Sequence, residues 1–240
     1  MSDGLTRGGI IAAGEGSRLR AGGYAMPKAL VPVGGVPLIE AVIRNFCAAG
    51  IEALVVIVNE QSRACVDWVR RRFPTLDIEF IVKTTRSSLE SFLEVGARLG
   101  PGPALVSTVD AWCRPTDFAR FVEAGRRRLL EGSTLGVTPF VADEAPLGAT
   151  VDPSGRITKL GDGAGPMVTA GFYLLAAEAR TAMPPPGLER LRDYLGWLAT
   201  RHPLYAEVVD TVVDVDRPED VALAETLGLS EPRDPQGGDR

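Results

Sequence analysis

The sequence is poor in the side chains on which several classes of enzyme and metalloprotein depend. It contains one histidine, His202, and three cysteines without a CxxC pair among its 240 residues. A metal site built from several histidines is therefore excluded, and neither a zinc knuckle nor a disulfide framework is indicated. A Ser-His-Asp triad would require His202, and no GxSxG motif accompanies that residue.

Long apolar stretches and extended basic segments are also missing. No apolar run approaches the roughly 20 residues of a membrane-spanning helix, and the first residues lack the layout of a signal peptide. The net charge is −5, and the arginine clusters at 70–72 and 126–128 lie within helical patterns. We therefore expect a cytoplasmic protein whose main partners are neither membranes nor nucleic acids.

Short apolar segments alternate with amphipathic stretches along most of the chain, which is typical of βαβ units around a mostly parallel sheet. The pattern predicts strands at residues 9–13, 53–58, 78–82, 104–109, 134–141, 168–175 and 205–213. It predicts helices at residues 37–49, 61–73, 88–99, 116–131, 188–201 and 218–227. Beyond residue 140 the alternation weakens, and residues 149–159 have the pattern of a β-hairpin.

These elements predict a single α/β domain over residues 1–230, with a Rossmann-like, doubly wound and mostly parallel sheet. Its first half, residues 8–140, has the alternation of a nucleotide-binding unit. The second half, residues 141–228, adds a smaller β-rich region. Residues 231–240 are polar and contain Pro, Gly and Asp, so we expect them to form a disordered tail.

A glycine-rich loop with basic residues follows the first predicted strand. The segment reads Ile10-Ile-Ala-Ala-Gly14-Glu-Gly16-Ser-Arg18-Leu-Arg20, and Pro27-Lys28 follows it. The glycines let backbone N–H groups approach a phosphate, and cations on one loop repel each other unless they are solvated or face an anion. The loop is not a GxGxxG fingerprint, because its third position is Leu19, and no GxxxxGK[ST] string occurs. We therefore predict a polyphosphate site of another kind.

These residues resemble those of the nucleotidyltransferases that join a nucleoside triphosphate (NTP) to a sugar 1-phosphate. That family opens with a strand, the motif (A)AGxGxRL and, after a loop, PKxLxPVxGxP. The chain matches with Ala12-Ala-Gly14-Glu-Gly16-Ser-Arg18-Leu and with Pro27-Lys28-Ala-Leu-Val-Pro-Val-Gly-Gly-Val-Pro37. The resemblance extends from residue 8 to residue 228 in the order of elements. It implies a glycosyltransferase-A-like fold with a small β-rich insertion that binds the acceptor.

The resemblance implies a role for each matching residue. Arg18 corresponds to the arginine that holds the triphosphate, and Lys28 to the lysine that contacts phosphate near the reacting centre. Arg20 has no fixed counterpart, and its role stays open. The residues implied to bind the nucleotide are Ala12, Ala13, Gly14, Gly16 and Ser17 in the loop, and Ser87 and Ser88 in place of the family's G-T-A segment.

Transfer between two anions needs charge neutralisation, usually by Mg²⁺ on one or two carboxylates. The resemblance implies that Asp110, after the strand at 104–109, is the first ligand, although Val precedes it where the family has Gly. The second ligand is Asp214 or Asp216, of which Asp214 aligns better. All three would lie at the carboxyl edge of the sheet, beside the glycine-rich loop. Helix capping is the alternative role for Asp110 and Asp216.

The acceptor half departs from the family pattern. The usual E-K-P segment is absent, and the nearest string leaves Lys159 as the candidate for the acceptor phosphate. Thr169 and Gly171 match the strand that lines the family's acceptor pocket, and Gly148 is assigned to the same pocket.

The sequence thus predicts an enzyme that converts an NTP and a sugar 1-phosphate into an NDP-sugar and diphosphate, with Mg²⁺ as cofactor. Because the attacking phosphate is already anionic, no general base is needed, in keeping with a chain that has one histidine. Two alternatives stay open. One is a cytidylyltransferase that acts on inositol phosphate or phosphocholine, or a relative that guanylylates a cofactor. The other is a non-catalytic nucleotide-binding module. The expected partners are small molecules, and a homodimer is among the oligomeric states left open.

Overall fold

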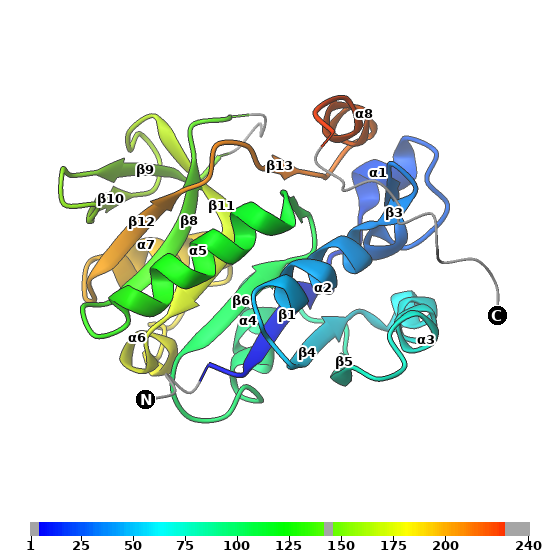
Figure 1. Ribbon diagram of the computed structural model, residues 1–240, viewed down its shortest axis with the longest axis horizontal. Coiled ribbons are helices and arrows are strands. Elements are labelled where there is room, and N and C mark those ends of the chain that lie inside the picture. The colour runs from blue at the N-terminus through cyan, green and yellow to red at the C-terminus, as the bar shows by residue number, and fades with distance from the viewer. Residues whose placement is uncertain (1–4, 142–145, 229–240) are drawn as a thin grey trace.

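The computed structural model describes residues 5–141 and 146–228. In its first half, four parallel strands lie in the order β6-β1-β4-β5 (Figure 1). They are β1 (Arg7–Ala12), β4 (Ala53–Val58), β5 (Asp77–Val82) and β6 (Ala104–Thr108). The chain leaves β1 to form β4 and β5 on one side and then crosses to β6 on the other. This reversal opens a crevice at the carboxyl ends of β1 and β6, where ligands of such sheets bind.

The second half continues the same sheet with mostly antiparallel pairing. Strand β11 (Met167–Leu175) lies antiparallel to β6, and β8 (Ser133–Thr138) lies antiparallel to β11. Strand β12 (Leu204–Val208) runs parallel to β8, and the hairpin of β9 (Gly148–Val151) and β10 (Ile157–Leu160) pairs with the start of β11. The predicted α/β fold and its β-rich addition are therefore confirmed, with the parallel pairing concentrated in the first half.

Helices cover both faces of the sheet (Figure 1). The core on one face includes residues of α2 (Leu38–Ala48), α3 (Arg63–Arg72) and α5 (Pro115–Arg128), and the core on the other includes residues of α4 (Ser88–Gly96), α6 (Ala177–Thr181) and α7 (Leu191–Ala199). Successive strand residues serve opposite cores, since Val56 belongs to the first and Val55 and Ile57 to the second. Strands covered on both faces have continuous apolar runs, which explains the apolar segments of the sequence.

Several short elements escape sequence prediction. The predicted strand at 205–213 divides, because the chain turns at Asp210, whose carbonyl oxygen accepts a hydrogen bond from Thr138 Oγ1 at 3.2 Å. Strand β12 ends at Val208, and β13 (Val213–Asp214) instead pairs antiparallel with β7 (Ala111–Trp112). Other short or unpredicted elements are α1 (Ser17–Ala21), β2 (Pro32–Val33) and β3 (Val36–Pro37). The last helix, α8 (Pro218–Thr226), begins with proline as predicted.

No helix within the two described ranges is both long and apolar enough to cross a bilayer. The tail predicted to be disordered, residues 231–240, lies outside the described residues.

Candidate active site

A lysine and an arginine meet carboxylates at the carboxyl edge of the parallel strands. Lys28 lies in a single 3₁₀ turn (Lys28–Leu30). Its Nζ donates to Asp110 Oδ2 at 2.6 Å and to Asp216 Oδ1 at 2.9 Å. Arg18 Nη1 in α1 donates to Asp216 Oδ2 at 2.5 Å. The structure thus brings together Arg18, Lys28, Asp110 and Asp216 from opposite ends of the chain.

The charges of this cluster stabilise one another. Burial of Lys28 opposes its positive charge, but the charges of Asp110, Asp216 and Asp214 outweigh burial and raise the pKa of Lys28. Burial alone would favour the neutral form of Asp110, but the charge and hydrogen bond of Lys28 prevail and lower the pKa of that carboxyl. Lys28 and Asp110 are therefore both charged at neutral pH.

The short ladder between β7 and β13 brings Asp214 to this edge. Asp214 pairs in register with Ala111, and the backbone N–H of Val215 donates to the carbonyl oxygen of Asp110 at 3.0 Å. Asp214 and Asp110 both line the cavity described below. Within the described residues, no group of three or more His, Cys, Asp or Glu side chains forms a ready metal site. Carboxylate oxygens are nevertheless the donors that Mg²⁺ prefers, together with phosphate oxygens of a substrate.

The glycine-rich loop leaves β1 beside the cluster. Gly16 adopts φ 63°, and a Cβ placed on it would lie 2.6 Å from Lys28 Cβ, so only glycine allows this close packing. Ala12 is buried at the end of β1, whereas Gly14 and Ser17 are exposed. An exposed loop of this kind can offer backbone N–H groups to a phosphate.

Asn59, which sequence reasoning missed, fastens this loop. It follows β4, and its side-chain amide donates to the carbonyl oxygens of Ala13 at 3.2 Å and Gly14 at 3.4 Å. The side chain is buried, and its Oδ1 has no hydrogen-bond partner among the described residues. The sequence does contain a signal for Asn59, because it is a polar residue directly after a buried apolar strand.

Ser87 and Ser88, predicted to contact the base, have roles in the fold. Ser87 Oγ accepts the backbone N–H of Glu90 at 3.1 Å and caps α4. Ser88 Oγ accepts the backbone N–H of Leu191 at 2.9 Å and so joins α4 to the start of α7. Ser88 also lines the cavity described next.

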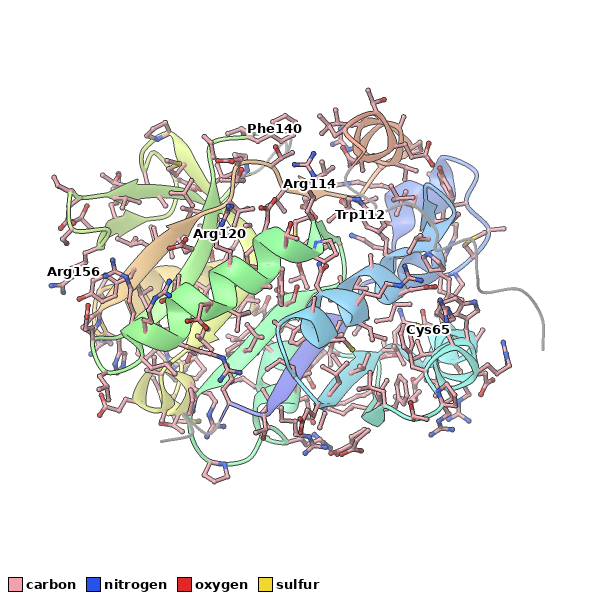
Figure 2. All side chains as sticks on the ribbon, in the orientation of Figure 1. Cys65, Trp112, Arg114, Arg120, Phe140 and Arg156 are labelled. Carbon is pink, nitrogen blue, oxygen red and sulfur yellow. The ribbon has the colours of Figure 1, made fainter. Side chains whose placement is uncertain are left out.

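A cavity of about 250 Å³ opens beside Asp110 and Asp214. Of the predicted acceptor residues, Thr169 and Gly171 line it, whereas Gly148 and Lys159 do not. Lys159 lies on β10 and donates to the carbonyl oxygen of Gly163 at 3.1 Å. The lining residues are Ser88, Thr108, Asp110, Ala111, Thr138, Phe140, Pro146, Leu147, Val168, Thr169, Ala170, Gly171, Tyr173, Leu191, Arg192, Val212 and Asp214. Figure 2 shows Phe140 at the upper edge of the molecule, close to β13.

Two lining residues show how the antiparallel half shapes this cavity. Gly171 adopts φ 79° at a register irregularity of β11, and a Cβ on it would lie 2.8 Å from Thr108 Oγ1 and 2.9 Å from Ala111 Cβ. Burial, together with the charges of Asp110 and Asp214, raises the pKa of Tyr173, so its hydroxyl stays protonated. Tyr173 and Arg192 were both missed by sequence reasoning, because nothing in their neighbouring residues marks them.

The fold and this charged crevice define an α/β protein of the nucleotide-binding type. The chain belongs to the family described as the MobA-like NTP transferase domain, whose model matches residues 8–145. The resemblance to NTP transferases in the sequence is thereby confirmed.

Comparisons with individual proteins agree with the family. The chain is 29% identical over 180 residues to the glucose-1-phosphate thymidylyltransferase of Actinoplanes sp., which covers 72% of this chain and 58% of that protein. The chain therefore spans little more than half of that relative's length. A solved UDP-glucose pyrophosphorylase complexed with UDP-glucose superimposes with TM-score 0.78 and 17% identity, covering 93% of this chain and 98% of that one. The inositol-1-phosphate CTP transferase from T. maritima gives TM-score 0.73 and 17% identity, covering 95% and 99%. At these identities the two structures show a shared fold.

Proposed function

We propose that this protein is a nucleotidyltransferase that joins an NTP to a sugar 1-phosphate and releases diphosphate. The observation that carries the proposal is the cluster of Lys28, Arg18 and the carboxylates Asp110 and Asp216, placed between the glycine-rich loop and the cavity. The thymidylyltransferase relative supports a sugar 1-phosphate as acceptor.

In the proposed reaction, an oxygen of the acceptor phosphate attacks the α-phosphorus of the NTP. A new P–O bond forms, the bond from the α-phosphorus to the bridging oxygen of the β-phosphate breaks, and diphosphate leaves. Lys28 and Arg18 offset negative charge on the phosphates, and the loop around Gly14 and Gly16 positions the triphosphate. No proton has to be removed from the nucleophile, so the site needs no general base.

Mg²⁺ is part of the proposal, with Asp110 and either Asp214 or Asp216 as its protein ligands. Asp214 aligns better with the family pattern and lines the same cavity as Asp110, which favours it as the second ligand. When bound, the ion would neutralise charge on the substrate phosphates. The carboxylates alone do not form a ready metal site, in keeping with an ion that also needs phosphate oxygens.

The two halves would share the substrates within one catalytic domain, because β6 of the first half pairs with β11 of the second. Ala12, Ala13, Gly14, Gly16 and Ser17, with Ser87 and Ser88, remain the proposed nucleotide side. Thr169 and Gly171 remain the proposed acceptor side, whereas Gly148 and Lys159 have no support from the cavity. The free thiols of all three cysteines are typical of a reducing compartment and support the cytoplasm as the site of action.

The test is acceptor-dependent release of diphosphate with Mg²⁺, measured for each of four NTPs with hexose 1-phosphates, inositol phosphate and phosphocholine. Release with one NTP and a hexose 1-phosphate is expected and would name the base. Turnover of CTP with inositol phosphate only would favour the cytidylyltransferase, whose fold the chain shares. NTP binding without diphosphate release with any acceptor would identify a binding module. Light scattering during chromatography would give the oligomeric state, with a homodimer as one option.

A further inference from the structure

Arg192 is a basic side chain in a cavity whose other charged groups are carboxylates. Among the described residues that line the cavity, Asp110 and Asp214 are the acidic ones and Arg192 is the single basic one. Arg192 lies in the first turn of α7, whose first backbone N–H is held by Ser88 Oγ. The cavity is therefore negative where it meets the charged cluster and positive where it meets α7.

The described residues leave much of the Arg192 charge unbalanced. Its Nη2 donates to the carbonyl oxygen of Pro146 at 3.0 Å, and the nearest carboxylate contact is to Asp162, at 4.0 Å. That carboxylate is fully exposed, whereas the Arg192 side chain is 26% exposed. The neighbouring acidic residue Asp193 pairs with Arg190, whose Nε donates to Oδ2 at 2.9 Å and whose Nη2 donates to Oδ1 at 3.3 Å. A guanidinium with several donors to spare suits an external carboxylate or phosphate.

Arg192 lines more than the cavity that contains Asp110 and Asp214. It also lines a second cavity, of about 490 Å³, which includes Leu160, Asp162 and Arg190 but neither Asp110 nor Asp214. Arg192 thus stands where the acceptor cavity adjoins this second cavity. Apolar walls strengthen any charge interaction there, because they exclude water. They are formed by Phe140, Pro146, Leu147, Val168, Leu191 and Val212.

We propose that Arg192 determines acceptor specificity by binding a second anionic group, at the end of the acceptor remote from the transferred phosphate. The acceptor class is then a sugar 1-phosphate that carries a further acidic group, such as a sugar acid. This inference rests on the proposed function and narrows it. A neutral hexose adds no negative charge to the few that the described residues offer Arg192, and the ammonium of phosphocholine is repelled by it.

The experiment compares glucose 1-phosphate with glucuronic acid 1-phosphate, which differ in one carboxylate, as acceptors for the wild type and for Arg192→Met. Inositol phosphate and phosphocholine complete the panel. We expect the wild-type kcat/KM to be at least about tenfold higher for the acid, as fits one partly buried charge pair. Arg192→Met should remove this preference by lowering kcat/KM for the acid alone. Arg192→Lys should restore part of it.

Arg201→Met is the matched control, because Arg201 follows the same helix, stacks on Trp197 and lines neither cavity. It should keep the preference for the acid. The inference is overturned if the wild type uses the neutral hexose, inositol phosphate or phosphocholine as well as the acid, or if Arg192→Met keeps the preference. These results leave the transferase function standing. Absence of diphosphate release with every acceptor overturns the function itself and the inference with it. If Arg192→Met fails to fold, Arg192→Gln and Arg192→Lys provide the same comparison.

Discussion

The two halves of the molecule build their parts of the site in different ways. In the first half, the groups follow directly from the ends of parallel strands, as the glycine-rich loop follows β1 and Asp110 comes shortly after β6. In the second half, cavity residues come from an irregular strand, from α7 and from the segment before β13. Groups at strand ends share an edge because of topology, whereas the second-half residues of the cavity meet through the packing of several elements.

This difference predicts where each substitution should act. Changes in the first half should affect the nucleotide and the chemical step. Changes in the second half should affect the acceptor and the stability of the antiparallel sheet. The following predictions are arranged from the largest expected effect to the smallest.

Lys28→Met should have the largest effect, because Lys28 holds both Asp110 and Asp216. Loss of a positioned cation typically lowers turnover about 10²- to 10³-fold. Diphosphate release measures the loss, and circular dichroism verifies the fold. Lys83→Met is the control, since Lys83 also binds two carboxylates, Glu90 and Glu94, but with a 41% exposed side chain. Equal losses in the two variants would contradict a special role for Lys28.

Gly171→Ala should weaken the acceptor half. It combines a left-handed backbone with a Cβ that would collide with Thr108 and Ala111. We expect a loss of about 2–3 kcal/mol in the free energy of unfolding and a raised KM for the acceptor. Gly187→Ala isolates the backbone effect, because Gly187 has φ 91° with no atom within 4 Å of a Cβ. Denaturant titration of both variants separates the two causes. If both variants lose the same free energy of unfolding, the contact of the added Cβ with Thr108 and Ala111 does not contribute to the loss.

Asn59→Ala should act on the nucleotide half alone. It removes the amide that donates to Ala13 and Gly14, so the loop loses an anchor. We expect the KM for NTP to rise about tenfold, as fits the loss of one or two buried hydrogen bonds, with the KM for the acceptor unchanged. Asn45→Ala also removes a buried amide, which donates to Cys113 Sγ at 3.6 Å and not to the glycine-rich loop. Asn45→Ala should leave both KM values unchanged. A change in the acceptor KM for Asn59→Ala would contradict the separation of the two substrates between the halves.

The smallest expected effect is a difference in reactivity among the thiols. It concerns the first half, which contains every cysteine. Burial raises the pKa of Cys65 and of Cys113 to about 12, so these thiols stay protonated and unreactive at pH 8. Cys47 is exposed and should react alone with a disulfide reagent in the native protein. Raising the pH to 10 should speed the reaction of Cys47, since thiolate is the attacking form, and leave the other two protected.

The control for this labelling is Cys47→Ser, which should abolish the native reaction. All three thiols of the wild type should react in denaturant. Rapid labelling of Cys65, which lies on α3 in Figure 2, would show that the first half opens more readily than its packing indicates.

The sequence was informative where function follows from local order. The alternation of strands and helices predicted the parallel sheet, and the motif from Ala12 to Arg18 predicted a loop that the structure places beside Lys28 and Asp110. The sequence did not predict the residues whose positions depend on partners far away in the chain. Arg192 has the local pattern of a helix-surface residue, and its place in the cavity depends on how α7 packs against the rest of the fold. Lys159 is the lysine of the string nearest to the family's E-K-P segment, yet its side chain donates to the carbonyl oxygen of Gly163 and does not line the cavity. Strands β7 and β13 are too short to leave a periodic pattern.

The ladder between β7 and β13 has a consequence for the order in which the site is completed during synthesis of the chain. The carboxylates Asp214 and Asp216 are synthesised long after Lys28 and Asp110, and they reach the cluster only when β13 joins β7. During synthesis the residues of the first half leave the ribosome before those of β13. Of the contacts in the complete fold, those of Arg18 and Lys28 with Asp216 need the segment that contains β13, whereas the contact of Lys28 with Asp110 does not. The pairing of β13 with β7 therefore completes the charged cluster on which the proposed activity depends.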